Sequence, residues 1–266
     1  MSHVPAERCL NVLELLAEGA RSMSLGEIAE RLQEPKSGIH RLLGTLLQRG
    51  WIEQDAQTGL YRLTMKLTLV GQRFYADTGI PDLCQPLLDQ LAAEAQDYVR
   101  LAVVAGGTLN WLGDAQGASG GLMYYPPQVS GAVPLHATAS GKAWLSTLDE
   151  NTALSLVMAQ GFSAAVKPGP QVITSADEFM REVRQAAKRG YGTAINEAES
   201  GVSAVAAAVR IQGEGPGVGT LSIAGPSIRM TVKRIQALAP VVIEYANRLG
   251  HIWPLRHRRG VPRACA

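Results

Sequence analysis

Cysteine, net charge and long apolar runs are all scarce in this 266-residue sequence, and each shortage excludes a class of protein. The three cysteines, Cys9, Cys84 and Cys265, are scattered and odd in number, which is not the pattern of a disulfide-rich secreted domain. No apolar stretch reaches the roughly 18 residues of a membrane helix. Glu7 and Arg8 stand where a signal peptide would be starting its apolar segment. The sequence therefore predicts a reduced, cytoplasmic protein with no membrane partner.

Bulk charge and metal-ligating patterns are also lacking. The formal net charge is only +2, so contact with a polyanion has to come from the local placement of cations. The five histidines are isolated, and no spacing of His, Cys and carboxylate residues is typical of a metal site. We expect neither a metal nor another cofactor. A hydrophobic fraction of 46% is enough for one large core or two ordinary ones.

The most informative stretch that is present is PKSGIHRLLGTLLQRG, residues 35–50. Its apolar positions recur at the spacing of one buried helix face. Gly50 is placed to end that helix. The opposite face has no acidic residue, so it is suited to lie against a polyanion. The basic, hydroxyl and amide residues on that face are Lys36, Ser37, His40, Arg41, Thr45, Gln48 and Arg49.

The segments around this helix predict a larger motif. Ser24 and Glu27 form the pattern of a capping box that opens a preceding helix, and Pro35 breaks the chain between the two helices. Pro35 is also suited to start the basic helix itself. Downstream, residues 51–55 and 60–63 are two short strand-like runs. A β-hairpin directly after such a helix is typical of the wing of a winged helix domain.

This order of elements predicts a winged helix-turn-helix domain over residues 1–62, with double-stranded operator DNA as its partner. The alternative is an ordinary three-helix packing unit with a solvated basic face. Arg41 is placed to bind either a phosphate or a guanine, and the sequence does not decide between them. The predicted DNA contacts are Lys36, Ser37, His40, Arg41, Thr45 and, on the wing, Arg62.

The chain is expected to divide near residue 80. Residues 63–76 have a mostly helical pattern, and residues 77–81 supply turn formers and a proline. We therefore predict a linker helix over 63–80, a second domain over 81–250 and a basic, flexible tail over 251–266. The arginines of the tail either keep it soluble or add a phosphate contact. They are Arg256, Arg258, Arg259 and Arg263.

The pattern of the second domain predicts an α+β fold, with helices around a mostly antiparallel sheet. A helix is expected from Leu83, and a hairpin is expected to turn at Gly106 and Gly107. A long helix over 176–189 and strands over 202–211 and 218–224 follow. Pro240 is expected to kink or restart a terminal helix over 231–249.

Several apparent catalytic motifs fail their structural requirements. Gly117–Gly121 matches a nucleophile elbow, but the Pro-Pro pair that soon follows cannot open the required helix. Gly141-Lys142 resembles the end of a phosphate loop, yet position 136 is His and position 143 is Ala. We find no nucleophile–base pair, and therefore expect a protein that is not an enzyme. A hydrolase that uses a pocket of the second domain is the less favoured alternative.

Three blocks of the second domain resemble the IclR family of bacterial transcription regulators. They are LHATASGKAWL (135–145), RGYGTAINEAESGVSAVAAAV (189–209) and GTLSIAGPSIR (219–229), and KSGIHRLLGTLLQRGWIE in the first domain fits the same family. The resemblance covers nearly the whole chain. It implies a GAF-like domain that binds a small-molecule effector, and dimers or tetramers of the chain. It also implies regulation of a catabolic operon, most often by repression, with activation as the alternative.

The resemblance also implies an effector site. It is formed in the family by the turn into the helix of the first block and by one strand from each of the other two blocks. Independently of the family, the free backbone N–H groups at a helix start suit a carboxylate. The corresponding residues here are Ala139, Ser140, Gly141, Ala194, Ala204, Ser222 and Ala224.

The alanines indicate the kind of effector. Family members that bind very small polar acids tend to have polar side chains at the positions of Ala194, Ala204 and Ala224. Alanine at all three favours a larger or more apolar effector, such as an aromatic acid. Asn196 and Glu197 either support such a site or hold a strand end. Four further residues are candidates to line the pocket, with core or interface packing as an equal alternative: Trp111, Met123, Tyr124 and Tyr125.

Overall fold

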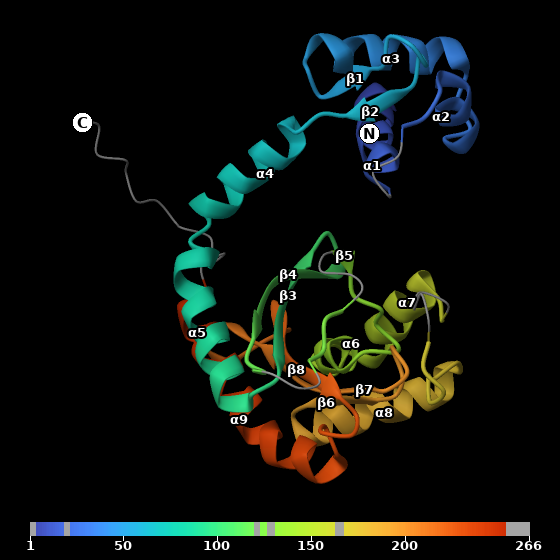
Figure 1. The fold of residues 1–266 in the computed structure, drawn as a ribbon. Coiled ribbons are helices and arrows are strands. Elements are labelled where there is room, and N and C mark those ends of the chain that lie inside the picture. Colours follow the sequence, from blue (N-terminus) through green and yellow to red (C-terminus); the bar gives the residue numbers. More distant parts are fainter. Residues whose placement is uncertain (1–3, 19–21, 120–122, 127–130, 163–167, 254–266) are drawn as a thin grey trace. The chain divides into compact units, whose positions relative to one another are not determined.

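A computed structural model describes the chain except for residues 1–3, 19–21, 120–122, 127–130, 163–167 and 254–266 (Figure 1). The chain divides into two compact units between Asp77 and Thr78. The arginines of the tail and Cys265 lie outside the described residues. No helix in the part of the chain that is described has the length and apolar content needed to cross a bilayer.

The first unit is a helix-turn-helix with a two-stranded wing, as predicted. β1 and β2 pair antiparallel, and an isolated bridge between Met23 and Tyr61 joins the wing to the start of the second helix. Gly59 has a φ of +71° in the turn between the strands. The elements are α1 (Val4–Ala17), α2 (Leu25–Arg31), α3 (Lys36–Gln48), β1 (Ile52–Gln54), β2 (Tyr61–Leu63) and α4 (Lys66–Asp77).

The capping box of α2 is confirmed. The backbone N–H of Glu27 donates to Ser24 Oγ at 3.2 Å, and the backbone N–H of Ser24 donates to Glu27 Oε2 at 2.7 Å. These hydrogen bonds hold the pKa of Glu27 below its usual value. The start of α3 differs slightly from the prediction, because Pro35 is the extended residue that caps the helix and Lys36 is its first residue. Gly50 follows α3 with a φ of +68°.

The apolar face of α3 is buried, as its periodicity predicted. Ile39, Leu43 and Leu46 pack in one cluster with Val12 of α1 and Ile28 of α2. Each of these side chains removes enough apolar surface from water to contribute about 1.5–3 kcal/mol relative to an exposed one. The cluster therefore holds the three helices together and leaves the polar face of α3 in solvent.

The second unit is built on a six-stranded sheet of order β5-β4-β3-β8-β7-β6, in which all neighbouring strands are antiparallel. The predicted turn at Gly106 and Gly107 is confirmed, with both residues at positive φ. The glycine-rich loop before Gly219 joins the neighbouring strands β7 and β8. The strands are β3 (Tyr98–Ala105), β4 (Thr108–Gln116), β5 (Gly131–Ala132), β6 (Gly192–Ile195), β7 (Val202–Val209) and β8 (Gly219–Pro226).

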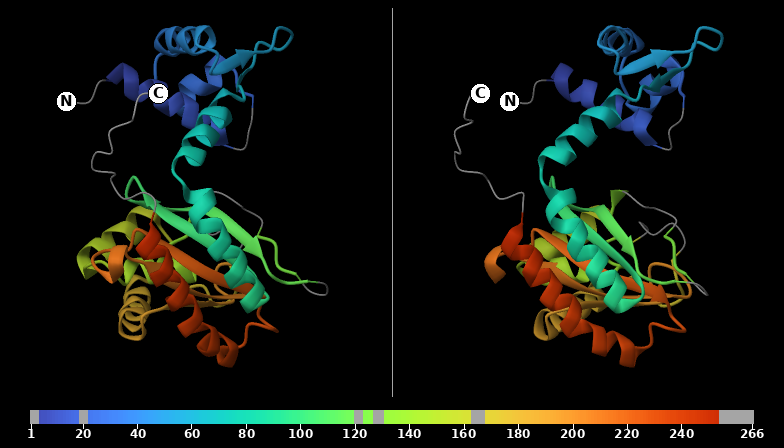
Figure 2. Two further views of the ribbon diagram at one scale, coloured as in Figure 1. Left: turned by 90° about the vertical axis from the view of Figure 1, so that its left-hand side faces the viewer. Right: turned by 60° about the vertical axis from the view of Figure 1, so that its left-hand side comes forward.

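Helices cover both faces of this sheet. On one face α5 (Ile80–Ala95) and α9 (Val232–Ile252) lie side by side, as both views of Figure 2 show. On the other face α6 (Ala139–Leu145) lies against β6, β7 and β8, with α8 (Ala176–Arg189) next to it. The helix α7 (Glu150–Gln160) packs on α8. The α+β architecture predicted from the sequence is thereby confirmed.

One predicted helix start in this unit is wrong, one of the two expectations for Pro240 is excluded, and one predicted helix end is right. The helix expected from Leu83 begins at Ile80, because Gly79 adopts a left-handed conformation at its start and Pro81 fits the first helical turn. The restart expected at Pro240 does not occur, since α9 runs unbroken from Val232 to Ile252. The end of α8 at Gly190, with a φ of +81°, is confirmed.

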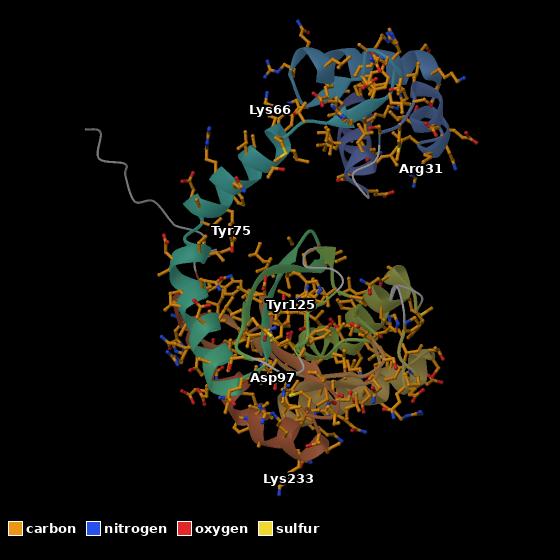
Figure 3. The ribbon with its side chains drawn as sticks, viewed as in Figure 1. Arg31, Lys66, Tyr75, Asp97, Tyr125 and Lys233 are labelled. Carbon is orange, nitrogen blue, oxygen red and sulfur yellow. The ribbon has the colours of Figure 1, made fainter. Side chains whose placement is uncertain are left out.

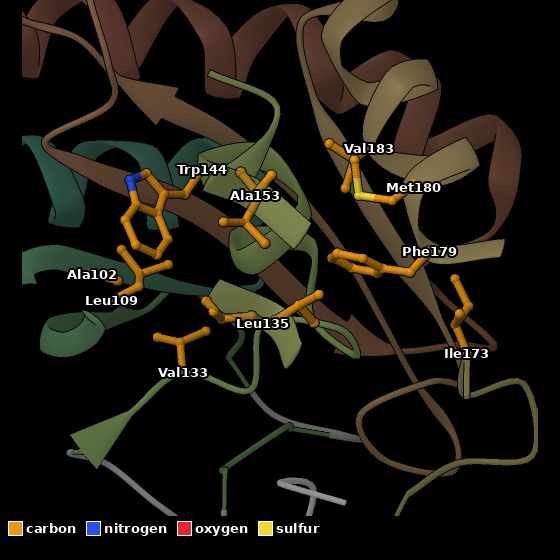
Figure 4. Packing of buried hydrophobic residues seen from close by; sticks show 12 residues of the cluster. Ala102, Leu109, Val133, Leu135, Trp144, Ala153, Ile173, Phe179, Met180 and Val183 are labelled. Carbon is orange, nitrogen blue, oxygen red and sulfur yellow. The ribbon is translucent and has the colours of Figure 1, made fainter. Parts of the chain in front are cut away.

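One hydrophobic core of the second unit lies between the sheet and the helices α6, α7 and α8 (Figure 4). Trp144 packs at one end of this core with Ala102 and Leu109, and Phe179 packs towards the other end. Because Trp144 belongs to α6, the core fixes the last turn of that short helix.

A buried carboxylate links the two helices on the opposite face to the start of β3. Asp97, labelled in Figure 3, is fully buried and accepts hydrogen bonds from Arg229 Nε at 2.9 Å and from Arg234 Nη2 at 3.3 Å. Arg234 also donates to the carbonyl oxygen of Ala95 at 2.6 Å. Gly225 leaves room for the carboxylate, since a Cβ there would lie 2.4 Å from Asp97 Oδ1.

We predict that Asp97→Asn destabilises the protein. The substitution keeps the shape of the side chain but leaves two arginines without their buried counter-charge, and a loss of about 3 kcal/mol in the free energy of unfolding is expected. Urea denaturation measures it. Glu150→Gln is the control, because it removes the charged partner of Arg184 in an exposed ion pair. It should leave the urea concentration at half-unfolding almost unchanged. Equal, small effects of both variants would contradict the prediction.

Candidate functional site

The polar face of α3 is exposed along its whole length. Lys36, Ser37, His40, Arg41 and Thr45 are all exposed, and Ile39 and Leu43 are buried on the other side. Thr45 Oγ1 donates to the carbonyl oxygen of Arg41 at 3.2 Å, which is a contact within the helix. The structure therefore brings the five predicted contact residues of α3 to one accessible surface.

The sixth predicted DNA contact is already engaged within the wing. Arg62 Nε donates to Glu53 Oε1 at 2.6 Å, and both side chains are exposed. Glu53 and Arg62 are directly paired across β1 and β2, so the hairpin register places them together. A phosphate would have to compete with Glu53 for Arg62.

A cation missed in the sequence lies at the other end of α3. Lys66, labelled in Figure 3, donates to the carbonyl oxygen of Arg49 at 2.5 Å and stands 5.0 Å from the ring of Trp51. A positive charge beside the last carbonyl groups of a helix is favourable. Lys66 therefore fixes the start of α4 against the end of α3.

In the second unit, three of the four predicted effector residues of the sheet meet in one cross-strand row. Ala194 of β6 pairs with Ala204 of β7, which pairs with Ala224 of β8, which pairs with Tyr98 of β3. Directly paired residues of an antiparallel sheet point to the same face. Three separate strands thus supply one apolar strip on the face that carries α6.

The next row on the same face brings α6 close to the sheet. Gly192, Ala206, Ser222 and Arg100 are paired in turn across β6, β7, β8 and β3. A Cβ at Gly192 would lie 2.3 Å from the carbonyl oxygen of Ala139, so only glycine allows this approach. Small side chains from the helix and the sheet fill the contact: Ala139, Ala143, Ala194, Ala204 and Ala206.

The predicted turn at residues 139–141 is the first turn of α6 itself. Thr138 caps the helix, and its Oγ1 accepts a hydrogen bond from the backbone N–H of Gly141 at 3.0 Å. Fewer N–H groups are therefore available to a ligand than at a helix start without a cap. Ser140 is buried, and its Oγ has no hydrogen-bond partner among the described residues. A buried hydroxyl without a partner is costly, and a ligand would satisfy it.

A buried ion pair anchors α6 to the end of β6. Lys142 is only 1% exposed, and its Nζ donates to both carboxylate oxygens of Glu197, at 2.7 and 2.6 Å, and to the carbonyl oxygen of Thr193 at 3.1 Å. Burial raises the pKa of Glu197, and the charge of Lys142 offsets part of that rise. Glu197 Oε1 also accepts the backbone N–H of Ile195 at 3.2 Å, so its role is to hold helix and strand together.

Asn196 also holds a strand end. Its Oδ1 accepts the backbone N–H of Gly201 at 2.8 Å and the hydroxyl of Ser227 at 3.1 Å, while its own φ is +52°. These hydrogen bonds show that Asn196 and Glu197 hold the end of β6, which is one of the two roles that the sequence left open for them.

Arg100 is the residue of this face that the sequence analysis missed. It is only 7% exposed, and its Cζ stands 3.6 Å from the ring centroid of Trp111. Ser222 Oγ donates to the carbonyl oxygen of Arg100 at 3.4 Å. Burial lowers the pKa of Arg100, while the neighbouring Tyr98, Tyr124 and Asp114 act in the opposite direction. The available signal was one charged residue inside an otherwise apolar strand.

The tyrosines of this region have different environments. Tyr98 and Tyr124 meet edge to face with ring centroids 5.9 Å apart, and the hydroxyl of Tyr124 donates to Glu199 Oε2 at 3.2 Å. Burial raises the pKa of both phenols, so both stay protonated at neutral pH. Tyr125, labelled in Figure 3, is 65% exposed and is therefore no core residue.

His136, next to the first block's helix, is buried without polar partners. Neither ring nitrogen has a hydrogen-bond partner within the described ranges, and the ring packs edge to face on Phe162 at 5.3 Å. Burial, together with the nearby charge of Lys142, lowers the pKa of His136. The side chain is therefore neutral in the folded protein at neutral pH.

A helix-turn-helix unit with an exposed basic helix, followed by an antiparallel sheet unit, defines a two-domain DNA-binding regulator. A family model described as "IclR helix-turn-helix domain" matches residues 5–56. A second model, "Bacterial transcriptional regulator IclR C-terminal", matches residues 73–251. The chain belongs to the IclR family of transcription regulators, as the resemblance of its sequence blocks indicated.

Individual relatives agree with this assignment. The chain is 30% identical over 242 residues to the acetate operon repressor of Salmonella typhimurium, which covers 91% of this chain and 87% of that protein. The structure of an IclR transcriptional regulator from Alicyclobacillus acidocaldarius has a TM-score of 0.75 at 24% identity, over 94% of this chain and 98% of that one. An IclR homologue from Microbacterium hydrocarbonoxydans was solved in complex with 4-hydroxybenzoate. It has a TM-score of 0.68 at 22% identity, over 92% of this chain and 99% of that one. At these identities the two structures show the fold alone.

We predict that His136 makes the protein less stable in mild acid. Because its folded pKa is depressed, the unfolded chain takes up a proton below about pH 6.5 that the folded chain does not accept. As the pH falls below this value, the free energy of unfolding of the wild type should decrease by up to about 1.4 kcal/mol per pH unit more than that of His136→Gln. Above pH 6.5 the two proteins should show the same pH dependence. Urea denaturation between pH 5.5 and 7.5 measures this, and identical slopes throughout would contradict it.

Proposed function

We propose that this protein is a transcription regulator, acting as a repressor of a catabolic operon, whose affinity for operator DNA is controlled by a small organic acid. The observation that carries the DNA-binding part is the exposed, acid-free face of α3, with Lys36 and Arg41 on it. The name of the Salmonella relative, acetate operon repressor, supports repression of an operon. Activation by the same machinery is the alternative. Because its target is bacterial DNA, the protein would act in the cytoplasm.

We propose residues 1–62 as the DNA-binding domain and residues 63–80 as the linker. In a two-fold dimer the two α3 helices would enter successive major grooves, about 10 bp apart on one side of the duplex. Ser37 and Lys36, at the start of α3, are placed for phosphate contact. His40, Arg41 and Thr45 follow along the same face, and Arg62 would contact the backbone from the wing once released from Glu53.

We propose the effector site at the face where α6 meets the sheet. Ala194, Ala204 and Ala224 supply an apolar wall, while the buried hydroxyls of Ser140 and Ser222 supply polar contacts. The other proposed contact residues are Ala139, Gly141 and Tyr124. An aromatic acid fits a wall of this kind better than a very small polar acid. That the Microbacterium homologue was solved with 4-hydroxybenzoate supports this class of effector.

We propose that α4 pairs with a second copy of the chain. Every residue of this twelve-residue helix is described, and none is buried within the protomer. Leu67, Leu69, Val70 and Phe74 of this helix are all exposed, and Phe74 is 69% exposed. A helix with large apolar side chains and no buried face is stable only when something covers it. A homodimer covers both copies at once, and two such dimers would make a tetramer.

An enzymatic role is the less favoured alternative. The glycine-rich Gly117–Ser119 segment is neither helix nor strand, and Gly120 and Gly121 lie outside the described residues. Ser140 is buried at a helix start without a hydrogen bond to a histidine. An activated serine needs a base within hydrogen-bond reach.

Thermal unfolding against a panel of carboxylates tests the proposed effector class. The panel runs from glyoxylate to substituted benzoates, because a ligand that binds only the folded state raises its stability by about 2.7 kcal/mol at a hundredfold excess over its dissociation constant. A selective shift with aromatic acids supports the proposal. A shift with only the smallest acids contradicts the apolar-wall argument.

Arg41→Ala should weaken binding to a DNA site selected from a random library by roughly 10- to 100-fold without altering the melting temperature. Fluorescence anisotropy measures the affinity. Arg184→Ala, an exposed arginine of the second unit, is the control and should change nothing. If Arg41 contacts phosphate, all sequences lose affinity equally; if it reads guanine, the preference at one position is relaxed. Unchanged affinity of folded Arg41→Ala would count against its place in the interface.

Phe74→Asp should shift the protein towards monomers, because a charge would have to be buried where two α4 helices meet. Sedimentation velocity at micromolar concentration measures the change. Met158→Asp is the control, since Met158 is also a large, exposed apolar residue and lies on α7. An unchanged oligomeric state of Phe74→Asp would exclude pairing through α4.

A further inference from the structure

A buried cation stands on the face that we assign to the effector. Arg100 occupies the sheet position between Ser222 of β8 and Asp114 of β4, one row from the strip that contains Ala204 and Ala224. The Cζ atom of its guanidinium stands 3.6 Å from the ring centroid of Trp111, so a cation–π contact restrains the group.

A buried guanidinium is suited to recognise a planar anion, because its N–H groups match the two oxygens of a carboxylate. Hydrogen bonds between charged groups are roughly twice as strong as neutral ones. The start of α6 is the weaker anion site by comparison, since Thr138 already accepts the N–H of Gly141.

We propose that Arg100 is the residue that determines effector specificity, by binding the carboxylate of an aromatic monocarboxylic acid whose ring lies against Ala204 and Ala224. This inference rests on the proposed effector site and adds the chemical group that the site selects. Ser222, paired with Arg100 across the strands, borders the carboxylate end. Ser140, whose buried hydroxyl lacks a partner, supplies a further donor from α6.

The same surroundings argue for one carboxylate rather than two. Asp114 is paired with Arg100 across β3 and β4, and Glu199 accepts the hydroxyl of Tyr124. These two acidic groups leave no surplus of positive charge for a second anionic group. A benzene dicarboxylate would therefore meet like charge and bind less well than a benzoate.

Isothermal titration calorimetry with 4-hydroxybenzoate and its uncharged analogue 4-hydroxybenzamide tests the proposal on the full-length protein. The wild type should bind the acid about 100-fold more tightly than the amide, the size expected for a buried charge-assisted pair. Arg100→Met should abolish that preference. Arg100→Lys should keep part of it, because lysine retains the positive charge but lacks the paired N–H donors of a guanidinium. Arg184→Met, an exposed arginine on α8, is the matched control and should keep the full preference.

The outcomes separate the two proposals. If the wild type binds acid and amide equally, or if folded Arg100→Met still prefers the acid, the role of Arg100 is overturned and the effector site stands. If the wild type binds neither compound nor any other aromatic acid, both proposals fail. The acid-to-amide ratio of the wild type needs no variant, so a poorly folded Arg100→Met cannot obscure the result.

Discussion

The ion pair between Lys142 and Glu197 is the interaction on which the proposed effector site of the second unit depends. It is buried, and breaking one side of such a pair typically costs about 3–5 kcal/mol. Lys142 is a residue of α6, and Glu197 follows β6, so the pair holds the short helix at the sheet while Gly192 allows the backbones to touch. The pair thereby helps to hold Ala139 and Ser140, two residues of our proposed site, at the alanine strip.

Few residues of the chain separate the strand that carries our proposed effector residues from the DNA-binding unit. Tyr98 and Arg100 are on β3, which begins three residues after the end of α5, and α5 begins three residues after the end of α4. Asp97, between α5 and β3, ties this junction to α9 through Arg234. A ligand on β3 that favours one position of α5 would bias α4, and α4 leads to the wing. Such a bias requires that the ligand bind two states with different affinity.

Local patterns predicted a good part of this structure. The capping box at Ser24 and the stop of α8 at Gly190 depend on a few neighbouring residues, and both are confirmed. The strand β6 was missed because Gly192–Ile195 is short and rich in small residues. Arg100 was missed because its burial follows from the sheet order, with β3 in the middle, and no local periodicity encodes that order. The pairing of Lys142 with Glu197, 55 residues apart, is equally non-local.

The most direct test of this account is the affinity for a selected DNA site, measured by fluorescence anisotropy with and without saturating 4-hydroxybenzoate. We predict that the acid changes the dissociation constant for DNA by about 5- to 150-fold, and that DNA changes the affinity for the acid by the same factor. A wild-type protein that binds both the acid and DNA, with neither affecting the other, would contradict an effector-controlled regulator.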